Sequence, residues 1–232
     1  MDILGRMAMD RDQRLQALNG ARLYFVCEAR PQGRQPDRLL RAALGGGADI
    51  IQLREKAPRC AEELIAFADP FRRAADERGA LFILNDRPDL VDACGADGVH
   101  IGQDDLPVAE ARRQAGPDAL IGLSTHTREQ IAAASAARGE SRPDQISVGP
   151  VWSTPTKEGR PATGIGLVEF AAREATVPWF AIGGIDSGNV RELVAAGASR
   201  VVVVRAIRDA ADPEEEARRL RAALAAAGGA RR

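Results

Sequence analysis

Short apolar segments alternate with longer amphipathic segments along most of the chain. The apolar segments are bounded by glycine, proline or polar residues, which is typical of buried parallel strands. The amphipathic segments are rich in Ala, Arg and Glu and place apolar residues at helical spacing. The predicted strands are residues 22–27, 49–54, 81–84, 98–101, 120–123, 145–148, 179–182 and 200–204. The predicted helices are residues 37–44, 61–78, 88–94, 108–114, 128–137, 166–175, 187–196 and 213–226.

This eight-fold alternation predicts an α/β fold, specifically a single (β/α)8 TIM barrel. No Pro/Ser/Gly-rich linker divides the 232 residues, so one domain is expected. We predict a polar N-terminal leader at residues 1–20, a TIM-barrel domain carrying the catalytic site at residues 21–226 and a C-terminal tail at residues 227–232.

Composition narrows the class of protein. Hydrophobic residues make up 45% of the chain, charged residues 28%, and the net charge is -1, as expected of a soluble globular protein without a bulk preference for nucleic acid. The apolar runs are far shorter than the roughly 18 residues that a membrane helix requires. Cys27, Cys60 and Cys94 are widely spaced and lack a CxxC motif, which favours reduced packing residues. Because the leader also lacks an apolar signal region, a cytoplasmic location is predicted.

Polar clusters are expected where barrel strands end, and the second strand ends in Gln52-Leu53-Arg54-Glu55-Lys56. Alternation along a strand projects Gln52, Arg54 and Lys56 to one face. Two cations suit a multiply charged anion such as pyrophosphate, and the amide is left to recognise a polar heterocycle. The alternative is an ordinary solvated strand end.

Carboxylates follow the third and fourth strands. Asn85-Asp86 ends one and Asp104-Asp105 follows the other, so two acids face the Arg/Lys pair of the second strand. Such a pair suits Mg²⁺ that shares its coordination with a bridging pyrophosphate, and spacing alone does not choose between Asp104 and Asp105. The alternative for Asn85-Asp86 is turn formation and helix capping.

The later strand ends carry hydroxyls and glycines. The fifth ends in Ser124-Thr125-His126-Thr127, where hydroxyls can bind an anion, although either threonine could be only a helix N-cap. We interpret His100 and His126 as hydrogen-bonded structural groups. The long loop after the sixth strand contains Thr154, Thr156 and Lys157 and is either a lid or a flexible surface loop. Gly183-Gly184 and Val204-Arg205 follow the last two strands, where barrels often hold a phosphate.

The ordered set QLREK, ND, GVHIGQDD, GLSTHT, GPVWSTPTK, IGGI and VVRAI resembles the thiamine-phosphate synthase family over about residues 21–225. The resemblance implies a transferase of thiamine biosynthesis. It would join 4-amino-2-methyl-5-(diphosphooxymethyl)pyrimidine to thiazole phosphate and release pyrophosphate by a dissociative, Mg²⁺-assisted route.

The resemblance also implies roles for individual residues. Asp86 and Asp105 would hold Mg²⁺. The thiazole phosphate would be received by Thr154, Thr156, Gly184 and the Val204-Arg205 backbone, and some relatives have serine where this chain has Arg205. The pyrimidine diphosphate would be bound by Gln52, Arg54, Lys56, Asn85, Ser124 and Lys157, among which Arg54, Lys56, Ser124 and Lys157 are the predicted catalytic residues.

Two alternatives remain open at this point. A thiazole tautomerase on a similar barrel would not need the pyrophosphate-binding set, and a non-catalytic barrel that senses a phosphorylated metabolite would not need metal ligands. Small-molecule substrates are the expected partners, without nucleic acid or membrane, and a homo-oligomer is left open.

Overall fold

Eight parallel strands close into a barrel in the computed structural model, which describes residues 9–55, 59–154 and 161–228. Each strand pairs with its neighbours in sequence, and β8 closes the barrel by pairing with β1. The predicted (β/α)8 TIM barrel is therefore confirmed. The strands are β1 (Leu23–Cys27), β2 (Ile50–Leu53), β3 (Leu81–Asn85), β4 (Gly98–Ile101), β5 (Leu120–Thr125), β6 (Gln145–Val148), β7 (Trp179–Ile182) and β8 (Val201–Val203).

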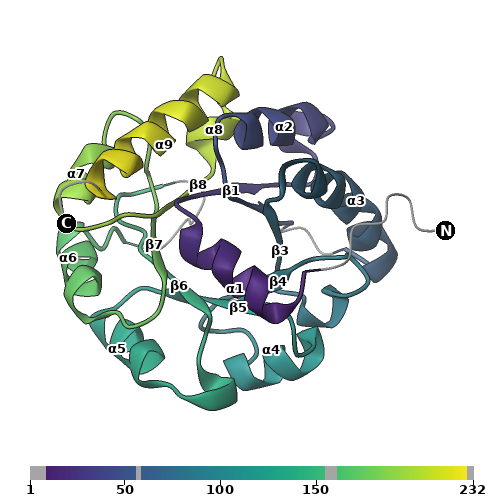
Figure 1. Ribbon diagram of the computed structural model, residues 1–232, viewed down its shortest axis with the longest axis horizontal. Helices are drawn as coiled ribbons and strands as arrows, with labels where there is room; N and C mark the ends of the chain where they lie inside the picture. Colours follow the sequence, from purple (N-terminus) through teal and green to yellow (C-terminus); the bar gives the residue numbers. More distant parts are fainter. Residues whose placement is uncertain (1–8, 56–58, 155–160, 229–232) are drawn as a thin grey trace.

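Helices form a ring around the barrel, as Figure 1 shows. They are α2 (Asp37–Gly45), α3 (Ala61–Arg78), α4 (Val108–Ala115), α5 (Arg128–Ala136), α6 (Ile165–Glu174), α7 (Val190–Ala195), α8 (Arg205–Arg208) and α9 (Pro213–Gly228), with α1 (Arg11–Gly20) across one end of the barrel. Short 3-10 turns lie at Pro31–Gly33, Pro88–Leu90 and Gly139–Ser141. None of the described helices combines the length and the apolar character needed to cross a membrane.

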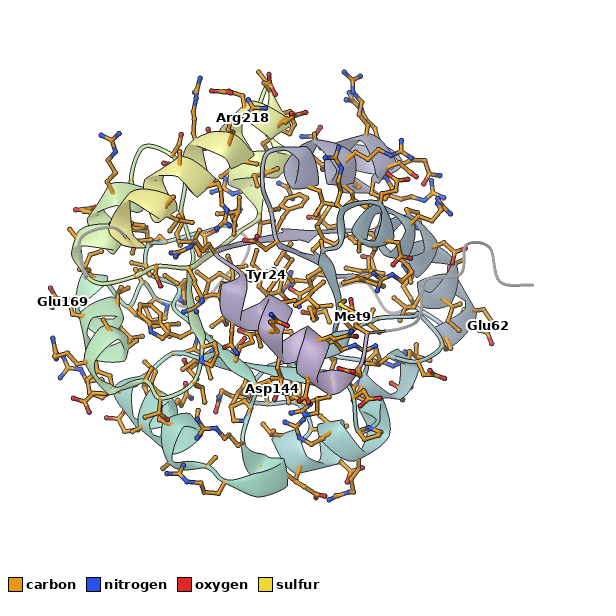
Figure 2. All side chains as sticks on the ribbon, viewed as in Figure 1. Met9, Tyr24, Glu62, Asp144, Glu169 and Arg218 are labelled. Atoms are coloured by element: carbon orange, nitrogen blue, oxygen red, sulfur yellow. The ribbon has the colours of Figure 1, made fainter. Side chains whose placement is uncertain are left out.

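The strands separate two apolar regions. Side chains such as Leu53 and Phe82 point outward and pack with the surrounding helices, while Tyr24, Ile50 and Phe180 fill the N-terminal half of the barrel interior. The rings of Tyr24 and Phe180 pack edge to face, with their centroids 5.6 Å apart. Figure 2 shows Tyr24 inside the ring of strands, whereas charged side chains such as Glu62 and Arg218 extend from the outer helices. Side chains thus fill the N-terminal half of the barrel interior, and space for a ligand is left at its C-terminal end.

An aspartate precedes each of the strands β2, β4 and β6. Asp49 accepts the backbone N–H of Leu23 at 3.0 Å, and Asp97 accepts that of Phe82 at 2.8 Å. Asp144 accepts the N–H of Ile121 at 2.7 Å. Each carboxylate therefore binds the backbone N–H of the first or second residue of the preceding strand, and this repeated contact fixes the register at the N-terminal end of the barrel.

Residues 11–20 of the predicted polar leader form helix α1, which closes the N-terminal end of the barrel (Figure 1). Asp10 and Gln13 begin it with a capping box, because each side chain accepts a hydrogen bond from the backbone N–H of the other residue. Arg11 then reaches Asp144 at 2.5 Å, and Leu18 is buried against the interior cluster. This part of the leader is therefore integral to the barrel.

Some predicted boundaries were wrong. The helix predicted at residues 88–94 is a 3-10 turn at Pro88–Leu90 followed by further turns, because the connection from β3 to β4 is too short for a full helix and its return. Helix α7 begins at Val190 and not at residue 187, since the Asp186 carboxylate accepts the N–H groups of Gly188 and Asn189 in a turn. The short helix α8 was not predicted.

Candidate active site

A cavity of about 670 Å³ opens at the C-terminal end of the barrel. It is lined by every predicted site residue that the structure describes, namely Gln52, Arg54, Asn85, Asp86, Asp105, Ser124, Thr154, Gly184, Val204 and Arg205. The other three, Lys56, Thr156 and Lys157, lie outside the described residues. Segments far apart in the sequence therefore meet in one site, as parallel barrel strands require.

Gln52 and Tyr24 place unpartnered polar atoms at the bottom of this cavity. Gln52 is 3% exposed and Tyr24 is 1% exposed, and both line the cavity. Neither the Gln52 Nε2 nor the Tyr24 hydroxyl finds a hydrogen-bond partner among the described residues. Burial raises the pKa of the Tyr24 hydroxyl well above its usual value, so this group stays protonated. Buried polar groups without partners are costly, and a polar ligand in the cavity would satisfy them.

Asp105 lies close enough to Asp86 to change the pKa of the Asp86 carboxyl. Partial burial, followed by the negative charge of Asp105, raises the pKa of Asp86 to about 6, while the Arg54 guanidinium opposes this shift. Asn85 donates to Asp86 at 2.5 Å, and the backbone N–H of Gly102 donates to Asp105 at 2.6 Å. Two carboxylates and one guanidinium therefore face each other at the rim.

This arrangement is compatible with Mg²⁺. The described residues contain no group of three or more His, Cys, Asp or Glu side chains that could hold a metal by themselves. Mg²⁺ is commonly bound through only one or two carboxylates, with water and substrate phosphates as the other ligands. The mutual repulsion of Asp86 and Asp105 is what a cation between them would relieve. The predicted pair fits a metal whose coordination the substrate completes.

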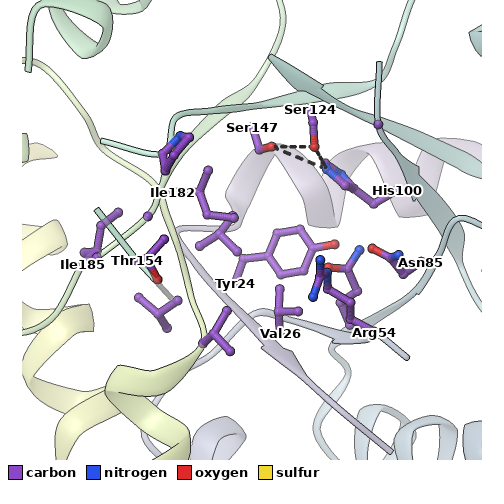
Figure 3. A pocket seen from close by; sticks show the side chains of 18 of the residues that line it. Tyr24, Val26, Arg54, Asn85, His100, Ser124, Ser147, Thr154, Ile182 and Ile185 are labelled. Atoms are coloured by element: carbon purple, nitrogen blue, oxygen red, sulfur yellow. Dashed lines mark hydrogen bonds between the residues drawn. The ribbon is translucent and has the colours of Figure 1, made fainter. Parts of the chain in front are cut away.

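His100 and Ser124 belong to a partly buried hydrogen-bond network on the β4–β6 side, drawn in Figure 3. The His100 Nε2 lies 3.0 Å from the Ser124 Oγ and 3.4 Å from the Ser147 Oγ. The Ser124 backbone carbonyl accepts from the Gln103 side chain at 2.6 Å. His100 is therefore hydrogen-bonded, as expected, but it also lines the cavity, and its ring contacts a predicted catalytic residue.

The opposite wall is formed by the ends of β7 and β8. Gly184 has a φ of 68°, and a Cβ at this position would lie 2.9 Å from the Trp152 Cβ, so both backbone conformation and space favour glycine. Val204 precedes α8, whose first residue is Arg205, and both line the cavity. The Arg205 side chain is exposed. Gly183 and Gly184 line this wall beside Ile182, Ile185 and Asp186. That backbone N–H groups here hold a phosphate stays a prediction.

Several lining residues were not identified as site residues from the sequence. Tyr24 lies within an apolar strand, and only the strand alternation that places it on the same face as Val26 could have indicated an inward position. Ser147 was equally hidden in β6, and its position beside Ser124 becomes evident only from the pairing of β5 with β6. The predicted set came from the strand ends, whereas Tyr24 and Ser147 lie within their strands.

Comparisons with known proteins agree with the motifs. The thiamine monophosphate synthase family model matches residues 23–207, which is most of the barrel. A thiamine-phosphate synthase of Acidothermus cellulolyticus is 49% identical over 212 residues, covering 91% of this chain and 98% of the relative. One from Mycobacterium tuberculosis is 48% identical over 220 residues, covering 90% and 97%.

A solved structure is similar over the same region. The thiamine phosphate pyrophosphorylase of Pyrococcus furiosus superposes with a TM-score of 0.79 at 28% identity, covering 90% of this chain and 98% of that one. The match spans nearly the whole of both chains, so it includes the strand ends that line the cavity. The resemblance inferred from the motifs is confirmed, and the chain belongs to the thiamine monophosphate synthase family of enzymes.

Proposed function

We propose that the protein joins 4-amino-2-methyl-5-(diphosphooxymethyl)pyrimidine to thiazole phosphate, giving thiamine phosphate and pyrophosphate. The observation that carries the proposal is one cavity with two chemically different walls. Arg54 and three aspartates, Asp86, Asp104 and Asp105, line the cavity at the ends of β2 to β4, and a wall that includes Gly183 and Gly184 lies at the ends of β7 and β8. Two phosphorylated substrates can therefore be bound side by side.

The pyrimidine diphosphate fits the β2–β5 side. Arg54 would bind the diphosphate oxygens in a bidentate manner, and the Gln52 amide and Ser124 hydroxyl, which line the same cavity, would recognise the ring. The aminopyrimidine can stabilise a cation once pyrophosphate leaves, so the route requires no nucleophile from the protein. The work left to these residues is orientation and neutralisation of the leaving group.

Asp86 and Asp105 are the residues that would hold Mg²⁺ at the diphosphate. When bound, the metal would neutralise charge that develops on the departing pyrophosphate. Arg54 lies beside the same carboxylates, and its charge keeps the pKa of Asp86 lower than burial and Asp105 alone would set it. The guanidinium therefore favours the ionised Asp86 that a metal needs.

The thiazole phosphate fits the β7–β8 side. Gly184 allows a close approach of the backbone, and Val204 and Arg205 present the start of α8 to the cavity. Thr154 lines the same cavity from the loop after β6. A phosphate anchored here would direct the thiazole nitrogen toward the pyrimidine methylene carbon on the opposite side.

A thiazole tautomerase is the main alternative on this fold. That reaction has no pyrophosphate to release, so it gives no reason for two acids and a guanidinium to converge at one rim. Burial, followed by the charge of Asp105, raises the pKa of Asp86, which supports a site where these charges meet at an electrostatic cost. A non-catalytic phosphate sensor is disfavoured for the same reason.

The proposal is tested by supplying the purified protein with both substrates and Mg²⁺ and detecting thiamine phosphate by mass spectrometry. Product should form only when all three are present. In parallel, the thiazole phosphate alone should show no isomerisation. Isomerisation without condensation would replace the proposed reaction by the tautomerase alternative, and binding without any turnover would favour the sensor.

A further inference from the structure

Three residues on adjacent strands form a row across the barrel wall. His100 on β4 is paired with Gly122 on β5, and Gly122 is paired with Gln145 on β6. The His100 and Gln145 side chains contact each other above Gly122, and the Gln145 Nε2 lies 3.1 Å from the His100 Nδ1. Gln145 is 4% exposed and does not line the cavity, so it reaches the site only through His100.

Gly122 is what allows this contact. A Cβ at residue 122 would lie 2.1 Å from the Gln145 Nε2 and 2.5 Å from the His100 Nδ1. The φ of Gly122 is not positive, so the backbone conformation gives no reason for glycine at this position. Glycine is needed here because any larger side chain would occupy the space of the hydrogen bond between Gln145 and His100. The hydrogen bond and the glycine beneath it are two separate observations that support the same arrangement.

The chemistry of the contact fixes the state of the imidazole. The structure orients the Gln145 Nε2 toward the ring, with the Oε1 of the same amide buried and unpartnered among the described residues. In this orientation the amide can only donate, so the His100 Nδ1 accepts and carries no proton. The neutral ring then has its proton on Nε2, and this N–H faces the Ser124 Oγ at 3.0 Å. One lone pair of the Ser124 oxygen is thereby occupied, and the Ser147 hydroxyl donates to the same oxygen at 3.5 Å. Both neighbours then act as donors to Ser124, which leaves its own hydroxyl proton for the cavity.

We propose that Gln145 is a positioning residue that acts through His100 to make Ser124 a hydrogen-bond donor toward the pyrimidine diphosphate. This inference deepens the proposed function and rests on it for the identity of the ligand. Gln145 sets the tautomer of His100, His100 donates to Ser124, and Ser124 donates to an acceptor atom of the substrate. His100 in this arrangement is a donor and not a base.

The second histidine offers an internal contrast. The His126 Nδ1 faces the carbonyl oxygen of Gly149, which can only accept, so His126 must carry its proton on Nδ1. The chain has two histidines, and the structure assigns them opposite tautomers. ¹⁵N-histidine labelling and long-range ¹H–¹⁵N correlation spectra at pH 7.5 distinguish the two, and a His126→Gln variant assigns the signals.

The expected spectrum of the unaltered protein shows His100 with Nε2–H and His126 with Nδ1–H. In Gln145→Glu a carboxylate that can only accept replaces the amide donor, so His100 should move its proton to Nδ1. In Gln145→Leu the preference should weaken. A His100 with Nδ1–H in the unaltered protein would overturn the proposal, and so would a His100 tautomer that does not respond to Gln145→Glu.

Steady-state kinetics distinguish a positioning role of Gln145 from a purely structural one. Gln145→Leu should lower kcat/KM for the pyrimidine diphosphate about tenfold, as loss of an indirect orienting partner commonly does. The same substitution in a Ser124→Ala background should add little further loss, because its route to the substrate is already removed. Gly122→Ala should reproduce the Gln145→Leu effect by separating the glutamine from the histidine. Additive losses in the Ser124→Ala background would contradict the proposed route.

Thr125→Val is the matched control. Thr125 is fully buried on β5 and donates to the Ser147 carbonyl at 2.9 Å, so the substitution also removes one buried hydrogen bond near the site. It should lower thermal stability to a similar extent as Gln145→Leu while leaving the His100 tautomer and kcat/KM nearly unchanged. Because the tautomer is read without any substrate, failure of this inference is distinguishable from failure of the proposed reaction.

Discussion

Replacing Arg54 by alanine removes the one described guanidinium at the diphosphate side whose charge also acts on Asp86. Arg54 is partly buried at the end of β2 and lies beside Asn85 in the cavity (Figure 3), which Asp86 also lines. Its backbone N–H is bonded to the Cys27 carbonyl at 2.9 Å, which holds the residue in place independently of its side chain. The substitution should therefore change the site and leave the fold intact.

The expected loss follows from the hydrogen bonds that a guanidinium makes to phosphate. A charge-assisted hydrogen bond contributes about 1.5 to 3 kcal/mol. A bidentate contact makes two such bonds, but the rim is open to solvent, which weakens both. We therefore expect Arg54→Ala to cost about 3 kcal/mol in total, or about 150-fold in kcat/KM for the pyrimidine diphosphate. Arg54→Lys keeps the charge but loses the planar fork, so about a tenfold loss is expected.

A second readout comes from pH. Mg²⁺ and protons compete for the Asp86 carboxylate, whose pKa is raised to about 6, so metal affinity should fall as the pH drops through that value. Arg54 lowers the pKa of Asp86, and its removal should raise it further. The Mg²⁺ concentration needed for half-maximal activity should therefore begin to rise at a higher pH in Arg54→Ala than in the unaltered protein.

The assay is steady-state release of pyrophosphate with each substrate and Mg²⁺ varied in turn, from pH 5.5 to 8.5. Arg87→Ala is the matched control, because Arg87 pairs with Asp89 at 2.6 Å just after Asp86 and does not line the cavity. Its kinetics should be nearly normal. An Arg54→Ala variant with unchanged kcat/KM and an unshifted Mg²⁺ profile would refute both the diphosphate contact and the coupling to Asp86.

Three further outcomes are expected. Asp105→Ala should lose most activity at millimolar Mg²⁺, since one of the two proposed protein ligands is gone, and full activity in the presence of a chelator would remove the metal assignment. Arg205→Ser should raise KM for thiazole phosphate by no more than about tenfold, equivalent to about 1.4 kcal/mol, with kcat nearly unchanged, because the exposed side chain adds only a screened attraction to a backbone-held phosphate. A fall in kcat by orders of magnitude would show instead that Arg205 reaches the reacting centre. Iodoacetamide should modify Cys60 well before Cys94, because Cys60 is exposed while burial raises the pKa of Cys94 to about 11, and mass spectrometry of peptides gives the order directly.

The barrel and its strand ends were predictable because each strand is a short apolar run with clear boundaries. Gln52 and Arg54 follow from alternation, and Asp86 follows from its place after a strand. The choice of Asp105 needed the family resemblance, because two adjacent acids look alike in sequence. In the structure Asp105 raises the pKa of Asp86, which puts those two carboxylates in one site.

Other features depend on contacts that sequence patterns do not reveal. Helix α1 is largely polar and Leu18 is its one fully buried residue, so its clearest local signal was the Asp10 and Gln13 capping pair. The Gln145 contact with His100 requires the register of three strands and a glycine between them. Such long-range pairings are set by closure of the barrel and not by any local preference.

The most direct test of the account is a time course in which pyrophosphate and thiamine phosphate are quantified in the same reaction with both substrates and Mg²⁺. The two products should appear in equal amounts from the first minutes, and Asp86→Ala should depress both together. Thiamine phosphate formed at the same rate in chelator, or pyrophosphate released without thiamine phosphate, would contradict the claim that this cavity couples departure of a metal-bound pyrophosphate to attack by the thiazole.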